Sequence, residues 1–269
     1  MANCKYLNLN LRLRTPQLNP TSVASYEVPN FYFFHTANAY DYVDPKTGHT
    51  NVHVDIASYK ADHYPYNEYA ISNVINPLKP YQVGRLVRYE LAAVDTKDPA
   101  VIARGTVKAA IPDMMAELPR ISKPASMDPN YRYVYGVSGN GVSAPGTQVP
   151  IGRLGNGVSN GGGGMTHASF YGHLFKSDWQ TGTFKSWVPQ YGESCPTEPI
   201  FIQRPGATEE DDGIVITITI NKEGTHSILV GLDGRTFEEV ARADMPQVYS
   251  LGPHGSFVEG DFGLVSTMG

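Results

Sequence analysis

Thiols and long apolar runs are both scarce in this chain of 269 residues. Its two cysteines, Cys4 and Cys195, form no CxxC pattern, so a disulfide framework is not expected and a cytoplasmic location fits best. No apolar run reaches the roughly 18 residues that a membrane-spanning helix needs. Residues 1–14 also lack the apolar segment of a signal peptide. Peripheral membrane contact stays open, because a surface patch leaves no clear linear pattern.

The chain also has little excess of either positive or negative charge. Charged residues make up 17% of the chain and the formal net charge is −5, with no basic stripe that would bind a phosphate backbone. Nucleic acid is therefore not expected as a partner. No long stretch shows apolar residues at the 3.6-residue period of an amphipathic helix. Tyrosine (17), phenylalanine (10), glycine (27) and proline (20) are plentiful instead, which favours strands joined by turns.

Short segments of alternating apolar and polar residues recur along the chain. The clearest are Leu7–Leu13, Asn51–Tyr59 and Ile214–Ile220, and turn-forming clusters separate such segments at Asp44–Gly48 and Asn221–Gly224. The sequence therefore predicts an all-β fold. The pattern alone does not choose among a sandwich, a barrel and a propeller.

A glycine-rich stretch, residues 136–164, interrupts this pattern. Asn140-Gly141-Val142-Ser143 recurs at Asn156–Ser159 and four glycines follow. A structureless segment of this length in a compact domain is either functional or disordered, and we expect a disordered insert. It has no Gly-Lys-Ser/Thr ending, which excludes a phosphate-binding loop. The acidic cluster Glu209–Asp212 is interpreted as a solvated loop that caps a hairpin.

Two of the eight histidines have unusual surroundings. His35 stands between Phe33-Phe34 and the run Thr36–Asp41, and His254 has glycines close on both sides, which permit close backbone approach. His49 and His53 are four residues apart but fall on a turn and a strand, so they do not predict a shared metal site. No serine nucleophile motif or reactive-cysteine signature is present.

The chain resembles the carotenoid cleavage oxygenases at five places that follow the family's order. The matching segments are Phe33–Asp41, Ala116–Ile121 with Tyr131–Tyr135, Glu198–Ile202 with Glu210–Gly213, Leu232–Ala243, and His254–Phe257. The first motif, Phe-Phe-His-Thr-x-Asn-Ala-Tyr-Asp, is most similar to fungal members that cleave torulene or related apocarotenoids. Five motifs in sequence are far more specific than any one of them.

The resemblance implies both a fold and a metal site. The fold would be roughly the C-terminal half of a seven-bladed β-propeller, with residues 1–269 forming one domain that is incomplete at its N-terminus. The metal would be iron(II), which the family holds with four neutral imidazoles, and His35 and His254 match the third and fourth ligands. Glu117 and Glu198 match carboxylates that orient ligand imidazoles, without an assignment of which carboxylate serves which histidine.

The activity implied is oxidative cleavage of a carbon–carbon double bond in a carotenoid or apocarotenoid. Dioxygen is the co-substrate and two carbonyl fragments are the products. A polyene needs an apolar tunnel rather than acid–base residues, which agrees with the lack of a nucleophile. Cleavage of a stilbene-type double bond is the nearest alternative, and a non-catalytic propeller fragment that acts as a binding module is an alternative of another class.

The chain departs from the family upstream of His35, where it contains no histidine. The family's first two histidine ligands, and one of the carboxylates that orient its ligands, therefore have no counterpart here. Three explanations are compatible with this departure: a truncated gene model or fragment of a full enzyme, a degenerate paralogue without catalysis, or a half that assembles with a complementary chain. Because two imidazoles hold iron(II) less well than four, we expect the isolated chain to bind iron poorly and to show no polyene cleavage.

Overall fold

The computed structural model describes residues 11–13, 24–60, 84–98, 100–111, 114–138, 172–190, 193, 196–249, 252 and 254–258. Regular structure within these ranges consists of β-strands and one 3₁₀ turn, η1 (Val94–Thr96), which confirms the all-β prediction. No helix among these residues has the length and apolarity needed to cross a membrane.

The strands form three four-stranded antiparallel sheets and one small sheet. The first sheet has the order β3-β4-β5-β7, the second β8-β9-β10-β11 and the third β12-β13-β14-β15. Their bounds are β3 Phe31–Val43, β4 Thr50–Lys60, β5 Arg85–Leu91, β7 Thr106–Ala110, β8 Glu117–Arg120, β9 Tyr133–Ser138, β10 His173–Asp178, β11 Thr183–Trp187, β12 Ile200–Gln203, β13 Gly213–Ile220, β14 Ser227–Asp233 and β15 Glu239–Asp244. In the small sheet, β2 (Ala24–Glu27) pairs antiparallel with β1 (Leu11–Leu13) and parallel with β6 (Ile102–Arg104).

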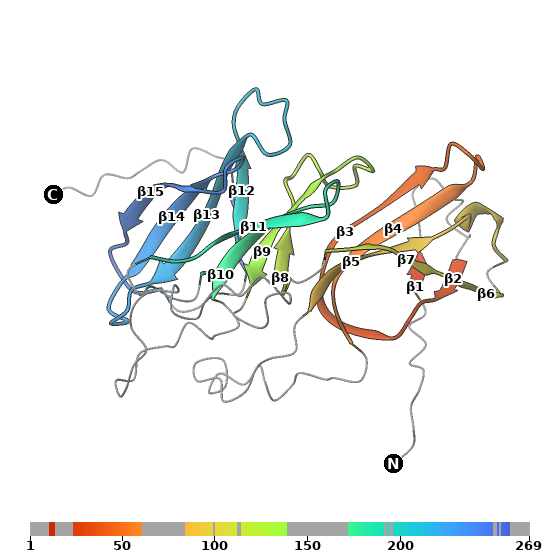
Figure 1. Ribbon diagram of the computed structural model, residues 1–269, viewed down its shortest axis with the longest axis horizontal. Helices are drawn as coiled ribbons and strands as arrows, with labels where there is room; N and C mark the ends of the chain where they lie inside the picture. Colours follow the sequence, from red (N-terminus) through yellow and green to blue (C-terminus); the bar gives the residue numbers. More distant parts are fainter. Residues whose placement is uncertain are drawn as a thin grey trace, which may run out of the picture.

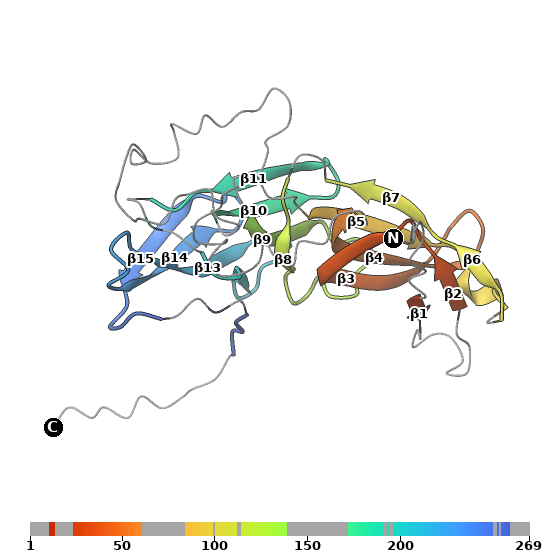
Figure 2. The same ribbon diagram turned by 90° about the horizontal axis from the view of Figure 1, so that it is seen from below.

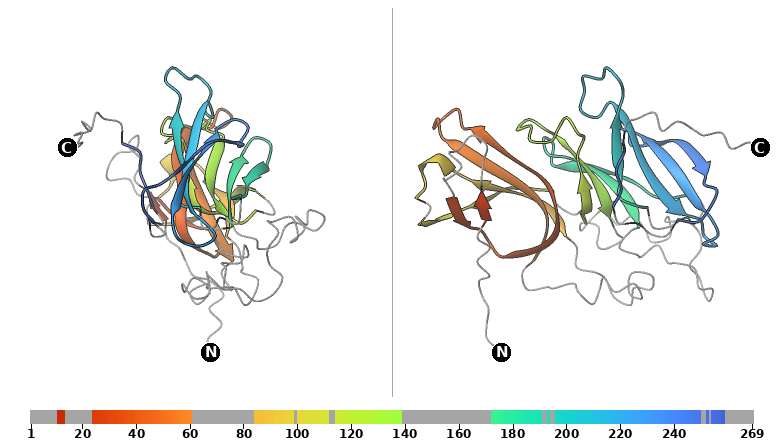
Figure 3. Two further views of the ribbon diagram at one scale, coloured as in Figure 1. Left: turned by 90° about the vertical axis from the view of Figure 1, so that its left-hand side faces the viewer. Right: turned by 180° about the vertical axis from the view of Figure 1, so that it is seen from behind.

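The three larger sheets follow one another along the long axis of the molecule (Figure 1). The view from below and the view from behind show the same open row, in which the described strands close no ring (Figures 2 and 3). The first strand of each sheet, β3, β8 or β12, lies at an edge of its sheet. The strands β3 and β8 also contact each other. Segments far apart in the sequence therefore meet where these edges come together.

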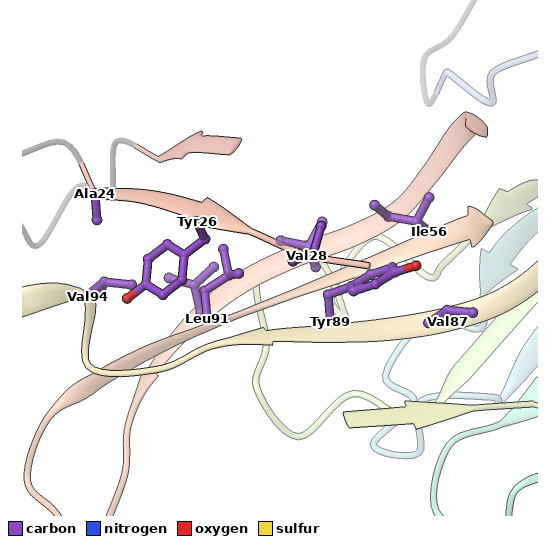
Figure 4. Close-up of a cluster of buried hydrophobic side chains, with 10 residues drawn as sticks. Ala24, Tyr26, Val28, Ile56, Val87, Tyr89, Leu91 and Val94 are labelled. Atoms are coloured by element: carbon purple, nitrogen blue, oxygen red, sulfur yellow. The ribbon is translucent and has the colours of Figure 1, made fainter. Parts of the chain in front are cut away.

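Strand β4 of the first sheet is buried on both faces. Val52, Val54 and Ile56 on β4 pack into a core with Tyr26 of the small sheet. Figure 4 labels Ile56 and Tyr26 within this cluster. As the alternation predicts, His53 and Asp55 point to the other face, yet they are buried too, with relative exposures of 8% and 0%. One face of β4 thus carries apolar residues and the other carries buried polar groups.

Strand β13 of the third sheet turns its less apolar face toward the second sheet. Val215, Thr217 and Thr219 of β13 are buried, and Val215 joins a core with Leu118 and Tyr135. On the opposite face Ile214 is exposed, and Ile216, Ile218 and Ile220 are partly exposed. The alternation correctly predicts the strand but not which of its faces is covered.

Buried charges contribute to the contacts between neighbouring sheets. Arg88 on β5 forms two 2.8 Å bonds with Asp55 of the same sheet, and its guanidinium lies over the rings of Tyr131 and Trp179, which flank β9 and β10 of the second sheet. Between the second and third sheets, the buried ammonium of Lys176 lies 2.6 Å from Asp211. Each of these buried charges has an opposite charge beside it, which is the condition for burying charge at low cost.

The acidic cluster Glu209–Asp212 lies in the β12–β13 hairpin connection, as expected, but only part of it is solvated. Glu210 accepts backbone N–H bonds from Arg132 and Tyr133 at 2.7 and 2.9 Å, and Asp211 pairs with Lys176. The solvated-loop interpretation is therefore wrong for these two residues, which link the third sheet to the second.

The expected insert at residues 136–164 begins too early. Residues 136–138 belong to β9, where Gly136 pairs with Phe175 of β10. A Cβ at Gly136 would lie 2.5 Å from the Phe175 ring, so this glycine permits close strand approach rather than disorder. Residues 139–164 lie outside the described residues, as do residues 7–10 of the predicted first strand.

Stability is expected to fall in acid because of the buried polar face of the first sheet. Burial alone would raise the pKa of Glu90, but hydrogen bonds from His53 and Lys108 lower it from 4.5 to about 2. Burial lowers the pKa of His53 below its ordinary 6.5. Both pKa values are lower when folded, so their stabilisation is present above the unfolded pKa and is lost as the pH falls.

In urea unfolding we expect the free energy of unfolding to decrease first below pH 6.5 and again between pH 4.5 and about 2. The variant Glu90→Gln should flatten the second decrease by about 1–2 kcal/mol, a value reduced for partial solvent screening. An unchanged profile in this variant would show that Glu90 does not carry the acid sensitivity.

Candidate metal centre

His35 lies on β3 at a break in strand register. The pairing of β3 with β4 shifts between Phe33 and Thr36 and again between Thr36 and Asn38. Irregularities of this kind re-aim side chains and are over-represented next to functional sites. The His35 side chain is 29% exposed, which leaves part of its ring accessible.

Glu117 holds the ring of His35. It is the first residue of β8 and is 1% exposed. Its Oε2 lies 2.6 Å from His35 Nδ1 and accepts the Leu118 N–H at 3.1 Å, while its Oε1 accepts the Tyr59 hydroxyl at 2.5 Å. A buried carboxylate requires such donors, and here both of its oxygens have them.

Glu198 holds the ring of His254 in the same way. It lies two residues before β12 and is 4% exposed. Its Oε1 lies 3.2 Å from His254 Nδ1, and its Oε2 accepts the Gly255 N–H at 3.1 Å. The structure thus pairs Glu117 with His35 and Glu198 with His254, which the sequence does not reveal.

The two imidazoles lie side by side although 218 residues of sequence separate them. Their ring centroids are 5.1 Å apart and the ring planes cross at 69°. An imidazole bound through Nε2 has its centroid about 3.2 Å from the ion, so two adjacent ligands have centroids about 4.5–5.5 Å apart. The observed separation fits that arrangement.

The donor chemistry also fits a divalent transition metal. A carboxylate accepts hydrogen bonds, so Glu117 and Glu198 favour the tautomer with the proton on Nδ1. The Nε2 lone pair of each ring is then available as a neutral donor, and carboxylate bonding raises its basicity. Imidazole nitrogen suits iron, zinc, copper and nickel.

The part of the chain that the structure describes offers two imidazoles for such a site and no group of three or more candidate metal ligands. His49 pairs with Asp95, and His53 lies between Tyr40 and Glu90, so these two histidines do not form a site together. His63 and His167 lie outside the described residues.

An apolar pocket of about 250 Å³ adjoins His254. Glu198 and His254 form one part of its wall. The rest is mainly aliphatic and comes from the partly exposed face of the third sheet, including Ile200, Ile216, Ile218, Ile220 and Leu229. The isoleucine face left uncovered by the second sheet therefore lines a cavity beside a candidate ligand.

Tyr59 and Arg120 also contact the two carboxylates, and the sequence did not single out either side chain for this site. Tyr59 contacts Glu117, and Arg120 Nε lies 3.6 Å from Glu198 Oε2. Tyr59 ends an alternating strand pattern, and nothing in that pattern marks its hydroxyl as part of a site. Arg120 belongs to the motif around Glu117, and that motif could have identified it.

Comparisons with known proteins identify a family for this chain. The profile of the family described as retinal pigment epithelial membrane protein matches residues 13–259. The rice carotenoid cleavage dioxygenase 8 homolog B is 32% identical over 246 residues, and the match covers 88% of this chain and 36% of that protein. Torulene dioxygenase of Fusarium fujikuroi is 27% identical over 256 residues, covering 87% of this chain and 39% of that protein.

A solved structure shows the same fold. The crystal structure of the cobalt-substituted apocarotenoid oxygenase of Synechocystis superimposes with a TM-score of 0.57 at 21% identity. The superposition covers 88% of this chain and 42% of that one. This chain therefore spans about two-fifths of the length of the relatives it matches.

Proposed function

This chain belongs to the retinal pigment epithelial membrane protein and carotenoid cleavage dioxygenase family, and from that premise we propose that it forms part of an iron(II) dioxygenase. Its reaction would be oxidative cleavage of a double bond in a carotenoid or apocarotenoid to two carbonyl products. The observation that carries this proposal is the pair of adjacent imidazoles, each fixed by its own buried carboxylate. Iron(II), when bound, supplies the dioxygen chemistry that such a cleavage needs.

The residues of this chain would hold the metal and set its surroundings. His35 and His254 would present Nε2, while Glu117 and Glu198 keep the proton on Nδ1 and fix the ring planes. Because the direct ligands would be neutral, the ion would keep its full charge. The carboxylates stay one layer away, where they orient the imidazoles without occupying the ion's open positions.

The pocket beside His254 fits a hydrocarbon substrate. Among the described residues that line it, only Glu198, His254 and Tyr249 carry a group of the kind used in acid–base catalysis. A polyene chain needs only apolar contact along most of its length, and burial contributes about 25 cal/mol for each Å² of apolar area. Carotenoid or apocarotenoid binding against Ile216, Ile218 and Leu229 follows from this match.

We further propose that the three larger sheets are blades of a seven-bladed propeller in one domain. The other blades and two more imidazoles would then come from outside the described residues. Their source would be either a longer form of this protein or a complementary chain. We also propose that the protein is located in the cytoplasm and contacts a membrane surface peripherally. Among the described residues only two imidazoles, rather than four, meet at the candidate site, which favours a second candidate, a propeller fragment that binds a polyene without cleaving it.

Apocarotenoid binding tests the substrate class. We expect an apocarotenal to bind saturably, and the variant Ile218→Asp to weaken binding at least about tenfold, because a buried carboxylate beside the polyene is costly. Val240→Asp is the matched control, since Val240 lies on the same sheet, is 59% exposed and does not line the pocket. Absorption titration of the polyene measures both affinities.

One result would contradict the proposed substrate site, and another would contradict the expectation of weak iron binding. Equal affinities in the parent and Ile218→Asp would remove the pocket from substrate binding. Stoichiometric iron with release of aldehyde products by the isolated chain would contradict the expectation that two imidazoles hold iron too weakly for turnover.

A further inference from the structure

The strand β8 carries two side chains that serve different halves of the candidate metal centre. Glu117 contacts His35, and Arg120, three residues later, contacts Glu198 and the segment that carries His254. In a regular strand, residues three apart point to opposite faces. The backbone of β8 departs from this rule: Leu118 has φ of +45°, and the register with β9 breaks between Glu117 and Arg120. Such a conformation is costly for a residue other than glycine and is characteristic of functional sites.

The first of the two contacts extends one step beyond Glu117. Its Oε1 accepts a 2.5 Å bond from Tyr59, a residue of β4 that is 2% exposed. A carboxylate held at one oxygen alone can turn about its terminal bond. With Tyr59 on Oε1 and His35 on Oε2, that rotation is blocked, and Glu117 is fixed to the first sheet in the orientation that holds the His35 ring.

The second contact ties His254 to β8. Arg120 Nη2 donates to the carbonyl of Gly255 at 3.1 Å, while its Nε lies 3.6 Å from Glu198 Oε2. The guanidinium therefore touches both the carboxylate that orients His254 and the peptide that follows His254. Its planar fork suits this double contact, whereas a lysine offers one point charge.

We propose that Tyr59 and Arg120 are positioning residues that fix the tautomers and relative orientation of His35 and His254 through Glu117 and Glu198. This inference rests on the proposed function for its purpose, but its geometry stands on the contacts above. Tyr59 acts on the His35 half, and Arg120 acts on the His254 half. Loss of either one leaves both direct ligands in place and disturbs their alignment.

The test uses Co(II) as the metal, with Tyr59→Phe and Arg120→Gln compared with the parent chain. We expect the Co(II) dissociation constant to rise about tenfold in each variant, the size typical of losing an outer partner of a metal ligand. The visible Co(II) absorption band should shift, because ring orientation changes. Nitrogen NMR of the metal-free chain should show loss of the single Nδ1–H tautomer at His35 in Tyr59→Phe and at His254 in Arg120→Gln.

Matched controls separate positioning from folding. Tyr42→Phe removes another tyrosine that donates to a carboxylate, at Glu90, and Arg204→Gln removes an exposed arginine paired with Asp212. Both should leave Co(II) binding and the tautomers unchanged. Arg120→Lys should restore little, because it cannot make both contacts.

The outcomes distinguish this inference from the proposed function. If the parent binds Co(II) and the two variants match it in affinity, spectrum and tautomer, the positioning roles are overturned. If the parent binds no Co(II) but the tautomers still change in the variants, the positioning roles stand and the metal proposal fails. Changes at both histidines in either variant, with lost thermal stability, would mean general unfolding and would also overturn the inference.

Discussion

Alanine at position 35 or 254 is expected to abolish specific metal binding by this chain. Each substitution removes one of the two neutral nitrogen donors that lie 5.1 Å apart, centroid to centroid. Because loss of an outer partner typically costs 10–100-fold in affinity, loss of a ligand itself should weaken Co(II) or iron(II) binding by more than about 100-fold. Anaerobic titration, with Co(II) absorption as the readout, measures the effect.

Two controls belong with this titration. His49→Ala removes an exposed imidazole that pairs with Asp95, and it should bind Co(II) like the parent chain. Glu117→Gln and Glu198→Gln keep the ligands but exchange an ionised acceptor for a neutral amide, so they should fall between the parent and the alanine variants. Binding that survives in both His35→Ala and His254→Ala would place the metal elsewhere.

Loss of Asp55 is expected to destabilise the fold severely. Its carboxylate is 0% exposed, receives two 2.8 Å bonds from Arg88 and accepts the hydroxyl of Tyr131. Burial raises the pKa of Tyr131 well above its ordinary value, so that phenol donates as a neutral group. In Asp55→Ala the guanidinium of Arg88 stays enclosed by aromatic rings without an anion.

Breaking a buried ion pair in this way costs about 3–5 kcal/mol. Urea unfolding should therefore show a much lower midpoint at an unchanged slope. The double variant Asp55→Ala with Arg88→Met should recover part of the loss, because the unpaired charge is removed with its partner. A change below about 1 kcal/mol in Asp55→Ala would show that this contact does not join the first two sheets.

The sequence predicted the strands and the four principal site residues for different reasons. Alternation identified β4 and β13 because side chains on a strand point to opposite faces in turn. Alternation does not say what covers each face, so the burial of His53 and Asp55 and the uncovered isoleucines of β13 became known only from sheet packing. The motifs around His35 and His254 identified those residues by resemblance alone.

The pairing of each carboxylate with its histidine, and the contacts of Tyr59 and Arg120, were beyond sequence reasoning. Glu117 lies 82 residues from His35, and Tyr59 lies 58 residues from Glu117. No local pattern encodes contacts over such separations; they arise because the first strands β3 and β8 meet at sheet edges. Likewise, nothing in the composition of Glu209–Asp212 shows that two of its carboxylates face a neighbouring sheet.

The most direct measurement is an anomalous-difference map from crystals of the chain loaded with Co(II). We predict one cobalt peak about 2.1 Å from Nε2 of both His35 and His254, with each Nδ1 on its own carboxylate. Cobalt bound to only one of these rings, or Nε2 atoms that point away from a common position, would contradict the proposed metal centre.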